Sequence, residues 1–239
     1  MFAAGVTCSD CHDPHSAKLR LPGDDTCLQC HSSDKYANTK HSGHGAAVPP
    51  LGCASCHMPV RNYMVVDPRH DHSFRVPRPD LSATLGSPNA CNDCHTDKQA
   101  AWAASAIERW YGPTRRDLQT FAEALDAAWT DKANAATLLA AVAADGGMPA
   151  IARASALTEL ASRVSPSNIG LARRGLADPD PMVRIGALDM LQNAPAIRIW
   201  PLVSPLLSDP SRGLALGTIS TLLTVVPLVF MARALANPA

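Results

Sequence analysis

The chain has 239 residues, with 21 basic and 21 acidic side chains and therefore a formal net charge of zero. This balance excludes the strongly basic composition that is typical of nucleic-acid-binding domains. The length suffices for two domains of ordinary size. Residues 1–96 contain all eight cysteines and all nine histidines but neither tryptophan nor glutamate. Because the composition changes so sharply, we predict two domains, at 1–112 and 113–239.

Every cysteine belongs to a five-residue pattern, Cys-x-x-Cys-His, which occurs four times. The four copies are Cys8 and Cys11 with His12, Cys27 and Cys30 with His31, Cys53 and Cys56 with His57, and Cys91 and Cys94 with His95. This pattern is the attachment signature of c-type haem. Each of its two thiols can add to one vinyl group of the porphyrin, and the histidine then ligates the iron. The sequence therefore predicts four haem c groups.

Three other uses of paired cysteines explain the pattern less well. A zinc ribbon needs two cysteine pairs for each metal and has no use for a histidine after each pair. A thioredoxin-like redox pair occurs singly, next to a strand–helix unit that this sequence does not show. A disulfide framework would not repeat the same two-residue gap four times.

Five histidines lie outside the motifs, and four irons need four sixth ligands. We predict that these ligands are His15, His41, His44 and His72, with His70 as the weaker candidate. A turn before His15 directs it toward a neighbouring haem, and the spacing of three lets His41 and His44 reach two different haems. An iron with both axial positions filled passes electrons, whereas a reductase or oxidase needs an open position.

Two methionines and four arginines are further candidates for contacts with haem. Met58 and Met64 are rival axial ligands, although we expect both to pack in the core instead. Haem propionates would make this domain acidic, and guanidinium groups suit carboxylates. The candidate propionate partners are Arg61, Arg69, Arg75 and Arg78. The alternative for each is a solvated surface charge.

Residues 1–96 contain too few large apolar side chains for an ordinary core, so the faces of four porphyrins would have to supply the buried apolar surface. We therefore expect a loop-rich domain of turns and short helices around stacked haems, unfolded in their absence.

Three segments resemble multihaem cytochromes c of the tetrahaem electron-carrier class, including carriers that serve hydroxylamine oxidation. They are Cys11-His12-Asp13-Pro14-His15, Cys56-His57-Met58-Pro59 and the run from Val66 to Asp80, in a similarity over about residues 5–112. Within it His72 matches the histidine before Ser-Phe, His15 the histidine of Pro-His, and His41 and His44 the histidine-rich stretch before the third motif. The resemblance implies closely stacked haems that act as an electron wire.

The rest of the chain is predicted to be helical, so that the fold class is mainly α. A capping box at Thr96-Asp97-Lys98-Gln99 predicts a helix that ends at Gly112-Pro113. The apolar positions of this helix and of a second helix from Pro113 are Ala103, Ile107 and Trp110, then Leu118, Phe121 and Leu125.

An internal repeat of 31 residues follows these two helices. The equivalent positions are Ala156, Ala187 and Thr218; Leu157, Leu188 and Ile219; Leu160, Leu191 and Leu222; Leu171 and Leu202; Leu176 and Leu207; Asp178-Pro179 and Asp209-Pro210. Two helices in each unit indicate an α-solenoid. The segment from Leu176 to Leu188 resembles a HEAT repeat, which implies a surface for partner docking or assembly, or a role in stabilising the haem domain.

Residues 213–232 carry no charge and would be long enough to span a bilayer. Because the stretch keeps the 31-residue register, we expect a repeat helix here rather than a membrane anchor. Haem c attachment takes place outside the cytoplasm, so we predict a periplasmic or extracellular protein. The first residues show no export signal, and we expect that signal to lie upstream.

The leading functional hypothesis is an electron carrier with redox protein partners and no catalytic residues. The first alternative is a multihaem oxidoreductase acting on small nitrogen compounds, which would keep one iron open. The second is a subunit of a homo-oligomer, a haem filament or a membrane electron-transfer complex.

Overall fold

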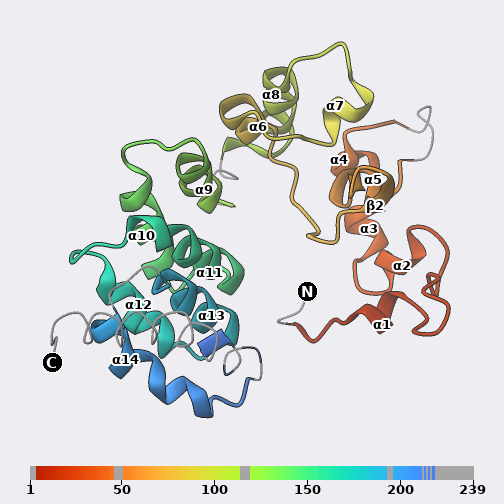
Figure 1. The fold of residues 1–239 in the computed structure, drawn as a ribbon. Coiled ribbons are helices and arrows are strands. Elements are labelled where there is room, and N and C mark those ends of the chain that lie inside the picture. Colours follow the sequence, from red (N-terminus) through yellow and green to blue (C-terminus); the bar gives the residue numbers. More distant parts are fainter. Residues whose placement is uncertain are drawn as a thin grey trace, which may run out of the picture. The chain divides into compact units, whose positions relative to one another are not determined.

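The computed structural model describes residues 4–45, 51–113, 119–192, 196–211, 213, 215, 217 and 218 (Figure 1). The chain forms two compact units, Met1–Leu118 and Gln119–Ala239. The predicted boundary, at 112/113, lies a few residues earlier. The chain is mainly helical, in agreement with the predicted class.

The first unit consists of short helices, one hairpin and many loops. Its helices are α1 (Cys8–Cys11), α2 (Asp25–Leu28), α3 (Ser33–Tyr36), α4 (Thr39–Ser42), α5 (Cys53–His57), α6 (Pro79–Leu85), α7 (Cys91–Cys94) and α8 (Ala100–Tyr111). Strands β1 (Val60–Tyr63) and β2 (Asp67–His70) pair antiparallel, with Val60 opposite His70 and Tyr63 opposite Asp67.

The hairpin is a difference from the sequence prediction, which contained only helices and turns in this region. At its tip Met64 and Val65 both have positive φ, of 47° and 74°. Together with Val66 they form the three-residue loop that joins the paired strands. The expected core packing of Met64 is wrong, because its side chain is 77% exposed at this turn.

Within the described part of the first unit, the buried apolar side chains are limited to a small group where α6 packs against α8. The group consists of Pro79, Leu81, Ala103 and Ala106. Such a group is far too small to hold about a hundred residues in a fixed arrangement. The described part of this unit therefore lacks a larger apolar core, as expected for a domain that is organised around a cofactor.

Helix α8 ends where the sequence predicts but begins later. Gly112, with φ of 75°, follows its last residue. Its N-cap is Gln99, whose side chain makes no capping hydrogen bond, so the predicted capping box from Thr96 is wrong. Helix α9 begins at Phe121, after a turn at Gln119 and Thr120, so the helix predicted from Pro113 does not run continuously through Phe121. Leu118 lies outside the described residues.

The second unit is built from helices in two layers (Figure 1). Its helices are α9 (Phe121–Trp129), α10 (Ala135–Ala144), α11 (Ala150–Glu159), α12 (Ile169–Leu176), α13 (Pro181–Met190) and α14 (Ala196–Val203), with short 3-10 helices at Leu160–Arg163 and Ser204–Ser208. Helix α11 contacts α9 and α13 in one layer, and α12 contacts α10 and α14 in the other. Together they bury a continuous apolar core that includes Leu139, Leu157, Leu160 and Leu191.

The 31-residue register of the sequence reappears in this unit as equivalent environments. Ala156, Ala187 and Thr218 are all fully buried. Two ion pairs also repeat: Arg153 binds Asp178, and Arg184 binds Asp209 with an N–O distance of 3.0 Å. Both partners of the second pair lie 31 positions after those of the first.

Some positions depart from the register or fall outside the described residues. Leu176 is buried whereas its equivalent Leu207 is 42% exposed. Ile219 and Leu222 are not described. Among the described helices none is long and apolar enough to cross a membrane, and most of 213–232 is not described.

Candidate haem-binding site

The four Cys-x-x-Cys-His motifs all form single helical turns. The first, third and fourth coincide with α1, α5 and α7, and the second begins in α2. In the first, second and fourth motifs the histidine amide donates a hydrogen bond to the carbonyl of the first cysteine, at 2.8, 3.1 and 2.9 Å. Residues three apart in a helical turn share one face, so the two cysteines of each motif lie on the same side. None of the eight is joined to another in a disulfide.

Three pairs of histidine rings face each other in the first unit. The pairs are His12 with His72, His41 with His57, and His44 with His95, at centroid separations of 6.1, 6.1 and 6.2 Å and interplanar angles of 34°, 13° and 27°. A metal–imidazole bond is about 2 Å long, so imidazoles on opposite sides of one metal have centroids about 6 Å apart. Each pair joins a motif histidine to a predicted distal histidine, and the separation fits one iron between them.

Hydrogen bonds to backbone carbonyls orient most of these rings. Nδ1 of His12 lies 2.8 Å from the Ala17 oxygen, and Nδ1 of His57 lies 2.7 Å from the Arg75 oxygen. His44 and His72 make the same contact with the carbonyls of Ser42 and His70, at 2.7 and 2.8 Å. A carbonyl only accepts, so Nδ1 must carry the proton. Nε2 is then left free to ligate a metal.

The second motif differs, because no histidine ring in the described residues contacts His31. Its ring instead packs edge-on against Tyr36 at 5.3 Å. His15 is the predicted distal histidine that faces no motif histidine. Its backbone amide donates a hydrogen bond to the Asp13 side chain, and no contact of its ring is seen among the described residues. His70 donates Nδ1–H to the Met58 carbonyl at 2.8 Å, as His12, His44, His57 and His72 do to other carbonyls. The sixth ligand for His31 therefore remains a prediction, with His15 and His70 as candidates.

Three aromatic residues of α8 support the paired histidines, and the sequence prediction had given none of them this role. Trp102 packs against His95 at 4.7 Å, and Trp110 against His44 at 6.3 Å. The Tyr111 hydroxyl donates to the His41 carbonyl and lies 3.4 Å from His41 Nδ1. Of the three, only Trp110 was identified from the sequence, as an apolar position of this helix; the signal for the others is that all three aromatic residues lie on one helix directly after the fourth motif.

Thiols of successive motifs lie close together. The thiols of Cys53 and Cys27 lie close enough to affect each other's pKa, and the Cys53 amide donates to Asp24 at 2.8 Å. Burial, together with the nearby Asp24 and Cys27, raises the pKa of Cys53 to about 12. Burial and then the neighbouring Cys94 likewise raise the pKa of Cys56. Thus the second motif adjoins the third, and the third adjoins the fourth.

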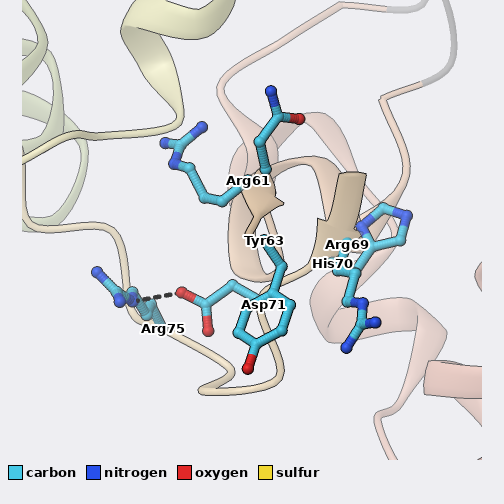
Figure 2. A pocket seen from close by; sticks show the side chains of 7 residues that line it. Arg61, Tyr63, Arg69, His70, Asp71 and Arg75 are labelled. Carbon is cyan, nitrogen blue, oxygen red and sulfur yellow. Dashed lines mark ion pairs between the residues drawn. The ribbon is translucent and has the colours of Figure 1, made fainter. Parts of the chain in front are cut away.

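The hairpin and the segment after it form a pocket of about 350 Å³ with several basic side chains. Its lining residues are Arg61, Asn62, Tyr63, Arg69, His70, Asp71 and Arg75. Figure 2 shows the ion pair between Arg75 and Asp71, at 2.8 Å. Arg61 is similarly paired with Asp93 at 3.0 Å, and Arg69 with Asp67. These three arginines are exposed and paired, so they carry little unsatisfied charge.

The donor set fits haem better than a metal held by protein ligands alone. Among the residues that the structure describes, no three histidine, cysteine or acidic side chains group as a metal site. Haem iron takes only two axial ligands from the protein, and the structure brings imidazoles together in twos. The facing pairs, the helical cysteine turns and the missing core are thus all compatible with covalently held haem.

Comparisons with known proteins point the same way. Residues 1–36 match the family model of the doubled CXXCH motif. Over 100 residues the chain is 27% identical to the multiheme cytochrome MtrA of Shewanella baltica (strain OS185), covering 40% of this chain and 26% of that protein. No solved structure matches the chain. The motif and this similarity support a multihaem c-type cytochrome with covalently bound haem c.

Proposed function

We propose that the chain transfers electrons through four haem c groups, one attached at each Cys-x-x-Cys-His motif. The three facing pairs of imidazoles carry this proposal, since two axial histidines suit an iron that passes electrons. When bound, haem supplies a one-electron couple. Its partners would be other redox proteins, in the periplasm or outside the cell.

The chain's own residues would hold the cofactors and close their irons to other ligands. In each of the three facing pairs the two imidazoles would ligate the iron from opposite sides. Carbonyl hydrogen bonds fix the ring orientation and raise the basicity of the ligating nitrogen. The close approach of Cys27 to Cys53 supports neighbouring cofactors, which electron transfer along the chain requires.

A multihaem oxidoreductase acting on small nitrogen compounds is the second candidate, and one observation favours it. His31 has no facing imidazole among the described residues, which is the arrangement that an open iron would need. The two candidates differ only in what completes the second motif.

For the second unit we propose a HEAT-like α-solenoid that docks redox partners or assembles the protein. The support is the 31-residue register, seen in the burial of Ala156, Ala187 and Thr218 and in the repeated Arg–Asp ion pairs. Stacked helical repeats expose an extended surface that suits protein partners.

Spectroscopy of the holoprotein tests these proposals. Pyridine haemochrome analysis should give four haems per chain. If all irons are closed, the spectra should be low-spin and the reduced protein should not bind carbon monoxide. The variant His72→Ala is the positive control, because it should open one iron to carbon monoxide.

Two further variants identify the sixth ligand at the second motif. His15→Ala and His70→Ala are compared, and the one that produces a high-spin, carbon monoxide-binding haem removes the ligand. If the unaltered protein already binds one carbon monoxide per chain, the oxidoreductase gains support and the fully closed carrier is contradicted.

A further inference from the structure

One arginine of the first unit is buried, unlike the other three candidate propionate partners. The Arg78 side chain is 7% exposed, whereas those of Arg61, Arg69 and Arg75 are 41% to 61% exposed. Arg78 precedes α6, which packs against α8. Its Nε and Nη2 bind the two oxygens of Asp80 at 2.8 and 2.7 Å. One edge of the guanidinium is therefore fully used.

The remaining nitrogen of Arg78 is buried without an acceptor. Nη1 has no hydrogen-bond partner among the described residues. Ser82 lies one helical turn further on and is 7% exposed, and its Oγ likewise has no partner among the described residues. Buried donors of this kind are nearly always satisfied in native proteins. Two of them in one short segment indicate an acceptor that the described residues do not provide.

The buried arginines of the second unit do not show the same pattern. Arg153 and Arg184 each leave only Nε, a single N–H, without a partner among the described residues. Arg78 leaves a whole amino group, and Ser82 adds a second unpaired group beside it in the chain. The arrangement around Arg78 is thus a stronger sign of a missing ligand.

Backbone hydrogen bonds tie this segment to a haem-attachment motif. The Arg75 amide donates to the His57 carbonyl at 2.9 Å, and Nδ1 of His57 donates to the Arg75 carbonyl at 2.7 Å. Arg78 follows three positions later, and α6 leads within a few residues to Cys91 of the fourth motif. The unpaired donors therefore lie in the stretch of chain that links the third motif to the fourth.

We propose that Nη1 of Arg78 and Oγ of Ser82 bind a propionate carboxylate of the haem attached at the third or the fourth motif. This inference rests on the proposed function, since it requires haem at these motifs. A guanidinium whose one edge is held by Asp80 still offers two N–H groups to a second carboxylate, in the charge-assisted geometry that arginine favours. The hydroxyl of Ser82 adds a neutral donor.

Redox titration of holoprotein variants tests the proposal. Arg78→Gln removes a buried positive charge near one haem, so reduction of that haem becomes less favourable. We expect at least a tenfold change in its redox equilibrium, about 59 mV for one electron. The pH range over which its potential varies should move upward, because the propionate loses its cation. Arg69→Gln, at an exposed ion pair, is the matched control and should change neither property.

A second variant decides the matter if Arg78→Gln fails to fold. If Oγ of Ser82 has no partner in the holoprotein, Ser82→Ala removes a buried unsatisfied hydroxyl and should raise the melting temperature. If Oγ binds a propionate, the same variant should lower the melting temperature and shift the carboxylate bands of isotope-labelled propionates in redox infrared difference spectra.

The outcomes separate this proposal from the function on which it rests. Folded Arg78→Gln with unchanged potentials, or Ser82→Ala with a raised melting temperature and unchanged carboxylate bands, would mean that water or nothing occupies the site. The haem content would be intact in both cases. A purified chain without haem would instead refute the proposed function itself.

Discussion

Helices α11 and α13 approach so closely that a single methyl group should disturb the second unit. A Cβ at Gly186 would lie 2.5 Å from the Ala154 carbonyl oxygen and 2.9 Å from the Ala154 Cα. Both atoms belong to the backbone, so relief requires the two helices to separate rather than a side chain to rotate.

The expected cost of Gly186→Ala follows from two opposing effects. Overpacking costs about 1–3 kcal/mol. The better helix propensity of alanine returns up to about 1 kcal/mol. Because the clash is with backbone atoms, the cost should lie in the upper half of the overpacking range. The free energy of unfolding of this unit should therefore fall by about 1–2 kcal/mol, which corresponds to a melting temperature lower by roughly 4–8 °C.

Gly170→Ala is the control, because the nearest atom to its added Cβ would be the flexible end of Arg174, at 3.8 Å. This variant should be as stable as the unaltered protein or slightly more stable. Thermal melts of the holoprotein would follow far-UV circular dichroism for the helices and the haem Soret band for the first unit. Equal melting temperatures for the two variants would refute the close approach of α11 and α13.

Two further predictions concern hydrogen bonds of single side chains. Tyr111→Phe removes the hydroxyl beside His41. It should change the electron paramagnetic resonance signal and the potential of one haem while all haems stay low-spin. The control Tyr63→Phe, at the exposed hairpin, should change neither, and identical signals in both variants would contradict the role of Tyr111. Burial would raise the pKa of Asp178, but hydrogen bonds from Arg153 and the backbone, with nearby positive charge, outweigh it and lower this pKa. The stabilisation is therefore present above the unfolded pKa of about 4 and is lost as the pH falls through the lower folded pKa. Asp178→Asn should lower the free energy of unfolding of the second unit by roughly 2 kcal/mol at pH 7 and should weaken the dependence of this free energy on pH between pH 5 and 2. An unchanged pH dependence would show that another group causes the loss of stability in acid.

The sequence signals were strongest where the chemistry is local. A cysteine pair and the histidine after it occupy one helical turn, so their spacing alone indicates what they can bind. The 31-residue repeat was also visible in the sequence, because each unit buries the same positions against its neighbour. Asp178 and Asp209 are among the repeat positions identified from the sequence. Their ion-pair partners, Arg153 and Arg184, keep the same register and could have been found from it.

Local patterns were less reliable at the borders of elements. Thr96 to Gln99 have the residue types of a capping box, yet the helix begins only at Ala100. The hairpin of β1 and β2 was missed because its turn contains Met64 and Val65 rather than the glycine or asparagine that normally indicates a left-handed turn.

The sequence by itself determined which residues can carry haem, since thioether formation and iron ligation depend on residue type and short spacing. Only the tertiary structure decided which histidines face each other and left His31 without a facing histidine ring among the described residues. Only the tertiary structure, too, distinguished the buried Arg78 from the other three candidate arginines, which are exposed. The reason is physical. Partners such as His12 and His72 are separated by long loops, and the way such loops fold back depends on contacts throughout the unit that no short pattern records.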